Sequence, residues 1–96
     1  MTTKQRSKLR SLAQTLEPIG QIGKGGISDN MLTGLSSALD ARELIKITVL
    51  KNAEDDARFL ADDLADALDA EVVCTIGHKI ELYRYSEKEG IKHIEF

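Results

Sequence analysis

The sequence is poor in several residue types: it has one cysteine, one proline, no tryptophan, two tyrosines and two phenylalanines among 96 residues. With Cys74 alone, no intramolecular disulfide and no cysteine-based zinc site can form. No apolar run approaches the roughly 18–20 residues that span a membrane. The basic N-terminal stretch MTTKQRSKLR is not followed by the apolar segment of a secretory signal. We therefore expect a cytoplasmic protein with no membrane partner, and so few aromatic rings predict no platform for stacking bases.

The residues of catalytic and cofactor sites are also missing. His78 and His93 show no metal-ligand spacing, and no Ser–His–Asp set or pair of catalytic carboxylates can be assembled. The phosphate-binding loop of nucleoside triphosphatases requires Ser or Thr after its lysine, whereas Lys24 precedes Gly25. The dinucleotide fingerprint requires a last glycine where Ser28 stands. We expect no enzyme activity, cofactor, metal or small-molecule substrate.

Charge is distributed unevenly along the chain, although the net charge is only −3. Residues 1–51 carry eight Lys and Arg against four Asp and Glu, a balance of +4. Residues 52–96 carry five against twelve, a balance of −7. This asymmetry indicates a polarised surface with a polyanionic partner on its basic side. The alternative is that the charges are simply solvated.

Apolar periodicity and turn residues predict one domain over residues 1–96 with elements in the order αβαβαββ. The predicted helices cover residues 3–16, 28–40 and 53–68. The predicted strands cover 19–22, 43–50, 71–76 and 79–85, and the tail is a candidate for a short irregular strand. Each strand–helix–strand unit crosses over right-handed, which places both crossover helices on the same side of the sheet. The expected fold is an α/β (α+β two-layer) domain with a four-stranded mixed sheet, helices mainly on one face and the other face partly open.

Single residues carry further expectations. Pro18 ends the first helix, because the residue before a proline avoids the helical region. Gly34 lies inside the second helix at a cost of roughly 1 kcal/mol relative to alanine, for which close packing is the candidate reason. Cys74 is expected to be a small buried hydrophobe. Tyr83 and Tyr85 are expected at edge or core positions, with stacking on a base as the alternative.

A glycine-rich turn, Gly23-Lys24-Gly25-Gly26, joins the first strand to the second helix. Glycines allow another backbone to approach closely. Backbone N–H groups at a helix start favour a phosphate, and Lys24 adds a positive charge. K-homology domains clamp a nucleic-acid backbone with a G-x-x-G loop of this type. The turn is therefore a candidate phosphate site, and an ordinary structural turn is the alternative.

Other basic residues point to the same chemistry. The first helix carries two i, i+4 pairs that flank its apolar stripe, and Lys46 lies on the solvent face of the second strand just after Arg42. Arg84 is either an extra phosphate contact or part of a structural ion pair. The acidic third helix is expected to lie away from this surface. The candidate RNA-binding residues are Gly23, Lys24, Gly25, Gly26, Lys4, Arg6, Lys8, Arg10, Arg42, Lys46 and Arg84.

Three blocks together, KQRSKLRSLAQTLEPIGQIGKGGIS, ELIKITVL and IGHKIELYR, resemble the YhbY family of small bacterial proteins. This family is the stand-alone form of the CRM domain, named for chloroplast RNA splicing and ribosome maturation. The resemblance extends from about Thr3 to Arg84. It implies an RNA-binding domain with a four-stranded mixed sheet, similar in fold to the C-terminal domain of translation initiation factor three.

The resemblance also implies a role. Bacterial members associate with precursors of the large ribosomal subunit, and the family's G-x-x-G loop maps onto Gly23–Gly26. Its basic surface maps onto the four cations of the first helix. The expected function is RNA binding in large-subunit assembly, by a monomer whose partner is ribosomal RNA or its precursor particle. One alternative is a protein–protein adaptor that uses the acidic third helix or the open sheet face. Another is a small enzyme that binds a nucleotide at the glycine turn.

Overall fold

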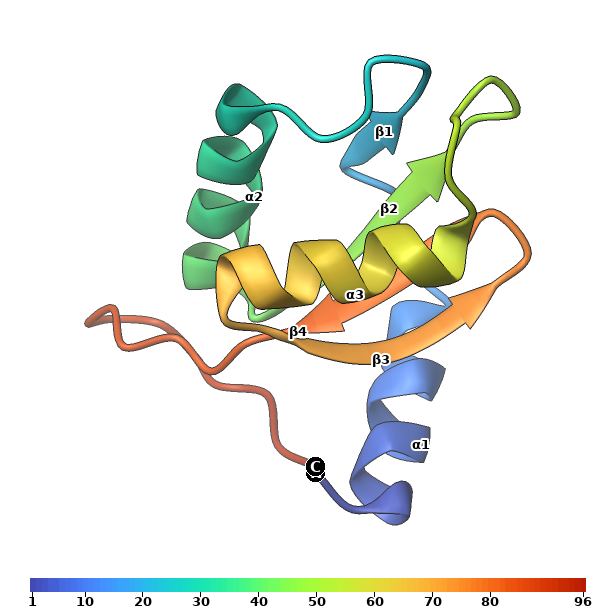
Figure 1. Cartoon of the computed structure of the whole chain (residues 1–96). Coiled ribbons are helices and arrows are strands. Elements are labelled where there is room, and N and C mark those ends of the chain that lie inside the picture. Colours follow the sequence, from blue (N-terminus) through green and yellow to red (C-terminus); the bar gives the residue numbers. More distant parts are fainter.

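The computed structural model describes all residues from Met1 to Phe96. The elements follow the predicted order αβαβαββ (Figure 1). They are α1 (Thr3–Ala13), β1 (Gly20–Ile22), α2 (Asp29–Arg42), β2 (Leu44–Val49), α3 (Ala57–Leu68), β3 (Glu71–Ile76) and β4 (Lys79–Tyr83). None of the helices is both long and apolar enough to cross a membrane.

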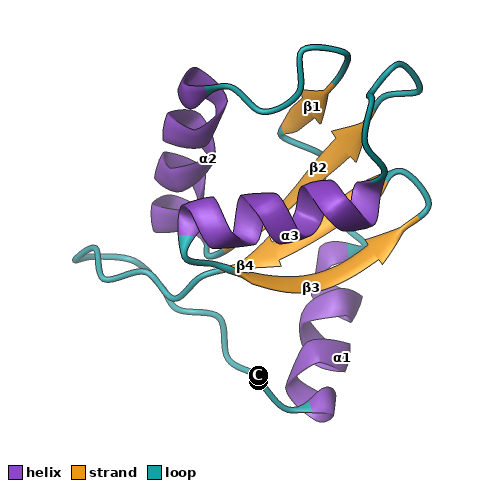
Figure 2. Ribbon diagram, in the orientation of Figure 1, coloured by secondary structure: helices purple, strands orange, loops and turns teal.

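The four strands form one mixed sheet in the order β1-β2-β4-β3 (Figure 2). β1 is parallel to β2, and β4 is antiparallel to both of its neighbours. β3 and β4 form the predicted hairpin, and Gly77 in its turn has φ +56°, a conformation that glycine adopts without strain. The hairpin places β4 inside the sheet and β3 at its edge.

Each face of the sheet has its own core, because side chains alternate along a strand. Ile45, Ile47 and Val49 join the larger core, which α2 and α3 cover. Leu44 belongs to the smaller core on the opposite face, where Leu9 of α1 packs. In Figure 1, α3 crosses in front of the sheet, α2 stands to its left and α1 lies behind its lower end. The predicted helix-covered face is confirmed, and α1 leaves part of the second face uncovered.

Two helices are shorter than predicted. α1 ends at Ala13 instead of residue 16, and Leu16 packs against the smaller core from the following turn. α3 begins at Ala57 instead of residue 53, because the carboxylate of Asp56 accepts a hydrogen bond from Phe59 N at 2.8 Å. An N-cap of this kind fixes where a helix starts. Consecutive acidic residues before Ala57 left several possible caps in the sequence.

The chain after β4 is not a strand. β4 ends at Tyr83 instead of residue 85, and residues 84–96 contain no regular element. This segment is nevertheless attached to the end of α2, since Arg84 N donates to the carbonyl oxygen of Glu43 at 2.9 Å. Phe96 packs edge-on against Tyr83, with ring centroids 5.0 Å apart.

The expectations for four single residues have clear outcomes. Gly34 faces open space, since apart from the adjacent backbone of α2 no atom lies within 4 Å of where a methyl group would lie, so the prediction of close packing was wrong. Cys74 is half-buried beside the smaller core, less enclosed than expected. Tyr83 is a core residue at 7% exposure, whereas Tyr85 is 59% exposed.

Candidate nucleic-acid interface

The glycine segment forms a tight exposed turn at the carboxyl end of β1. Gly26 N donates a hydrogen bond to the carbonyl oxygen of Gly23 at 3.0 Å. Gly26 has φ +70°, in the left-handed region that favours glycine. No atom lies within 4 Å of the side-chain position of Gly25 or Gly26, and Lys24 is exposed at the tip. Another backbone can therefore approach this turn without displacing protein atoms.

The start of α2 is less open to an anion than the sequence indicated. Ile27 packs against the larger core and separates the turn from the helix. Ser28 caps the helix, and its hydroxyl accepts a hydrogen bond from Met31 N at 3.1 Å. Asp29 adds a negative charge in the first turn. The open backbone is that of the glycine turn, not that of the helix start.

Acidic side chains border one side of the glycine turn. Glu54 and Asp55 line a hollow of about 100 Å³ together with Gly23–Gly26. Their charges disfavour a phosphate on that side, so the electrostatically favourable approach to Lys24 is from the opposite side.

The uncovered part of the second sheet face carries cations from two strands. Thr48 is the cross-strand partner of Lys79, and Lys46 is the partner of Glu81. These four positions alternate with the residues of the larger core and so point to the face on which α1 lies. Lys79 Nζ donates to Thr48 Oγ1 at 2.8 Å, which holds the ammonium group on this face.

The structure separates the two basic pairs of α1. Arg6 lines a hollow with Cys74 of the edge strand β3 and with Asp62 of α3, and Arg10 lies close enough to Glu81 to influence its ionisation. Arg10 therefore faces the uncovered strands, and Arg6 borders them at the β3 edge of the sheet. By helical spacing, Lys4 and Lys8 lie on the opposite flank of the buried Leu9 stripe.

We call the surface made by Arg6, Arg10, Lys46 and Lys79 the basic sheet face. It adjoins β1, the strand that leads to the glycine turn, because Gln21 of β1 is the cross-strand partner of Thr48 of β2. The acidic helix α3 packs on the other side of the sheet, as predicted. The sheet thus lies between the strand cations Lys46 and Lys79 and the acidic helix α3.

Glu81 is a buried carboxylate within the basic sheet face. It is 2% exposed, and its Oε1 atom has no hydrogen-bond partner. Burial raises the pKa of Glu81, while the charges of Lys46 and Arg10 partly oppose this shift. The ionised carboxylate reduces the positive potential of the surface above it. The sequence analysis missed both Glu81 and Lys79, although strand alternation would have found them once the register with β2 was known.

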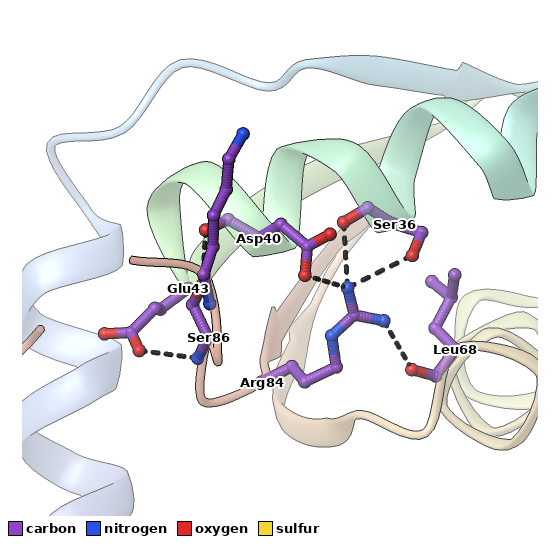
Figure 3. A network of polar contacts seen from close by, with 7 residues as sticks. Ser36, Asp40, Glu43, Leu68, Arg84 and Ser86 are labelled. Atoms are coloured by element: carbon purple, nitrogen blue, oxygen red, sulfur yellow. Dashed lines mark hydrogen bonds and ion pairs between the residues drawn. The ribbon is translucent and has the colours of Figure 1, made fainter. Parts of the chain in front are cut away.

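Arg84 is bound inside the protein (Figure 3). Its Nη1 donates to the carbonyl oxygen of Leu68 at 2.8 Å, at the end of α3. Its Nη2 donates to the carbonyl oxygen of Ser36 at 2.8 Å and pairs with Asp40 Oδ1 at 3.0 Å. Of the two alternatives for Arg84, the structure shows the structural ion pair, and the side chain connects α2 to α3.

Arg42 lies outside the basic sheet face. It is exposed in the last turn of α2 and borders two hollows that both include Ile19, at the edge of the sheet beside β1. One of these hollows also includes Lys46, so Arg42 lies next to the basic sheet face without belonging to it.

Glu43 organises the segment after β4, and nothing in the sequence pointed to it. Its side chain is fully buried and accepts hydrogen bonds from Ser86 N at 2.7 Å, Ile94 N at 2.8 Å and the His93 ring at 2.7 Å. Burial alone would raise the pKa of Glu43, but these hydrogen bonds outweigh it and hold the pKa below its ordinary value. Figure 3 shows Glu43 and Ser86 beside the Arg84 network.

Comparisons with known proteins agree with this architecture. The model of the CRS1 / YhbY (CRM) domain matches residues 1–84. The chain is 46% identical over 95 residues to "Probable RNA-binding protein YqeI" of Bacillus subtilis, covering 99% of this chain and 97% of that protein. It is 33% identical over 92 residues to a Haemophilus influenzae "RNA-binding protein", covering 96% and 93%. The solution structure of SAV1595 from Staphylococcus aureus, described as "a putative RNA binding protein", matches with a TM-score of 0.78 and 47% identity over 93% of each chain.

Proposed function

The chain belongs to the CRS1/YhbY (CRM) domain family, and on this premise we propose that it binds RNA and assists assembly of the large ribosomal subunit. The observation that carries the proposal is the position of the basic sheet face, which leads to the glycine turn and lies across the sheet from the acidic helix α3. The names of its relatives support RNA as the polyanion. The ribosomal role comes from the family resemblance of the sequence. We propose that the protein works in the cytoplasm as a monomer without a cofactor.

RNA phosphates would lie along the uncovered strands. Arg6 and Arg10 at one end and Lys24 at the other supply positive charge, with Lys46 between them. Gly25 and Gly26 leave the backbone of the turn accessible to a phosphate oxygen. Lys4 and Lys8 on the far flank of α1 would contact a neighbouring strand of folded RNA. Contacts of this kind position RNA but read little of its sequence.

Charge reversal tests the phosphate contacts. We expect Lys24→Glu and Lys46→Glu each to weaken binding to a large-subunit RNA fragment and to flatten its salt dependence. Each lost contact to single-stranded RNA should lower the slope of log affinity against log salt by about 0.7. Lys92→Glu, an exposed position in the C-terminal segment, is the matched control and should change the slope little. Equal slopes for Lys24→Glu, Lys46→Glu and wild type would exclude the glycine turn and the basic sheet face as the site of the phosphate contacts.

Sedimentation in lysate at low salt tests the ribosomal role. We expect the wild-type protein to move with large-subunit precursors and Lys24→Glu to stay near the top of the gradient. If neither protein moves with ribosomal particles, RNA binding can stand but the ribosomal assignment is wrong. If both move equally, the glycine turn is only a turn.

A protein–protein adaptor is the second candidate, and Phe59 is the observation that favours it. This side chain is 56% exposed on the acidic helix α3, near Asp62 and Asp63. An exposed aromatic side chain among carboxylates suits a basic protein segment. In that case Asp62→Asn with Asp63→Asn would release the protein from pre-ribosomal particles, and digestion of the RNA would not.

A further inference from the structure

An apolar groove of about 540 Å³ lies where α1 ends and the chain turns toward β1. Leu12 and Leu16 form one wall, and Leu44 of β2 lies in its floor. Ile94 of the C-terminal segment closes the far side. Leu12 is 40% exposed, so the groove opens to solvent. Its size lies within the range of small-ligand sites and exceeds what one flat heterocycle needs.

The walls of the groove are held in place by hydrogen bonds. Ile94 N donates to the buried Glu43 carboxylate at 2.8 Å, and Ile19 N donates to the carbonyl oxygen of Lys46 at 2.9 Å. Leu16 N donates to the carbonyl oxygen of Ala13 at 3.1 Å. The groove is therefore formed before any ligand arrives, and a ligand does not bear the cost of ordering it.

Four polar side chains border the apolar surface: Thr15, Glu17, Arg42 and Lys46. Arg42 is a permanent cation that can pair with a phosphate. Glu17 as a carboxylate only accepts hydrogen bonds, so it favours an amino group and disfavours a carbonyl oxygen. A ligand that complements the apolar walls, the Glu17 carboxylate and the Arg42 cation has a flat apolar body, an amino group and an attached phosphate.

We propose that this groove holds one unpaired RNA base that bears an exocyclic amino group, an inference that rests on the proposed RNA-binding function. The base packs against Leu12, Leu16 and Ile94, its amino group donates to Glu17, and its phosphate pairs with Arg42. Lys46 borders the groove and also belongs to the basic sheet face, so an RNA strand on that face is already next to the groove. Phosphate contacts alone read little sequence, and the groove supplies base selection.

Three oligonucleotides separate base from phosphate binding: oligocytidylate, oligouridylate and an abasic oligomer of equal length, measured by fluorescence anisotropy. Wild type should bind oligocytidylate about fivefold more tightly than the abasic oligomer, the effect of removing roughly 40 Å² of apolar base surface from water at about 25 cal/mol per Å². Oligouridylate should bind more weakly than oligocytidylate, because uracil presents a carbonyl oxygen to Glu17 where cytosine presents an amino group.

Two variants assign the preference to the groove. Thr15→Trp places a large side chain at an exposed position on its border and should remove the preference for oligocytidylate over the abasic oligomer. Ser11→Trp, exposed on α1 outside the groove, is the matched control and should keep this preference. Glu17→Gln should remove most of the cytosine-over-uracil preference, because an amide both donates and accepts.

The outcomes separate this inference from the proposed function. If wild type binds the abasic oligomer as tightly as oligocytidylate, RNA binding stands and the base site is wrong; an apolar protein side chain then becomes the occupant to test. If Thr15→Trp and Ser11→Trp weaken all oligomers equally, the groove has no role in base selection. If wild type binds none of these oligomers or the large-subunit RNA fragment, both proposals fail.

Discussion

Replacing Glu43 by glutamine tests whether one buried carboxylate holds the C-terminal segment to the end of α2. The carboxylate accepts three hydrogen bonds with its two oxygens, two from the backbone N–H groups of Ser86 and Ile94 and one from the His93 ring. Glutamine has nearly the same shape but only one oxygen. Its amide NH₂ group must then face at least one backbone N–H group that it cannot satisfy.

The magnitude follows from these contacts. An unsatisfied buried donor costs about 1–3 kcal/mol, and hydrogen bonds to a charged group are worth about 1.5–3 kcal/mol each. We expect Glu43→Gln to lower the free energy of unfolding by about 3 kcal/mol. At roughly 0.05–0.15 kcal/mol per residue, a domain of this size has a total of about 5–14 kcal/mol. The loss is therefore a large fraction of the total.

Urea unfolding measures the loss. With a slope of about 1.5–2 kcal/mol/M, typical of small domains, the midpoint should fall by about 1.5–2 M. Because folding lowers the pKa of Glu43, its ionised form stabilises the fold at pH values above the ordinary pKa of 4.5. This stabilisation is lost as the pH falls through the lower pKa of the folded state. The difference between wild type and Glu43→Gln should therefore shrink in acid. Glu95→Gln, an exposed substitution in the same segment, should change the midpoint little.

Two results would refute this reasoning. A midpoint within about 0.3 M of wild type would mean that the carboxylate contributes little net stability. A difference between wild type and Glu43→Gln that stays constant down to the acid transition would mean that the ionised form is not what stabilises the segment.

Three further predictions concern stability and binding. Glu81→Gln should raise the free energy of unfolding at pH 7, because burial raises the pKa of Glu81 and its ionised form destabilises the fold. In urea unfolding this gain should disappear as the pH falls through the raised pKa to the ordinary value of 4.5. A loss of stability at pH 7 would contradict the prediction. Gly26→Ala should lower the melting temperature by about 4–8 °C, since a non-glycine residue at φ +70° costs about 1 kcal/mol. Gly25→Ala, at an open position without a positive φ, should leave the melting temperature unchanged. Equal melting temperatures for the two variants would contradict the argument from backbone strain at Gly26. Arg84→Ala should cost about 2 kcal/mol in urea unfolding, because it leaves the carbonyl oxygen of Leu68 at the end of α3 unpaired and removes the cation that pairs with Asp40 of α2. The salt slope of RNA binding should stay at the wild-type value, and a flattened slope would return Arg84 to the interface.

Local patterns in the sequence predicted much of the fold. The alternation of Ile45, Ile47 and Val49 identified β2 and its buried face, and the Gly77–His78 dipeptide identified the hairpin. The glycine turn was recognised because its four residues are consecutive in the sequence. The helix ends at Ala13 and Ala57 were misplaced, because nearby residues offered competing caps and turns of similar energy.

The sequence by itself determined the order of the elements, the faces that they bury and the presence of a basic half, since these depend on residues within a few positions of one another. Only the tertiary structure decided that β4 lies between β2 and β3, which brings Lys79 and Glu81 beside Thr48 and Lys46. It also decided that Arg84 is bound inside the protein. These outcomes depend on register and on contacts across more than 30 residues of chain, such as Lys79 with Thr48. No local pattern specifies such pairings, because their energies exist only after the sheet and its two cores have formed.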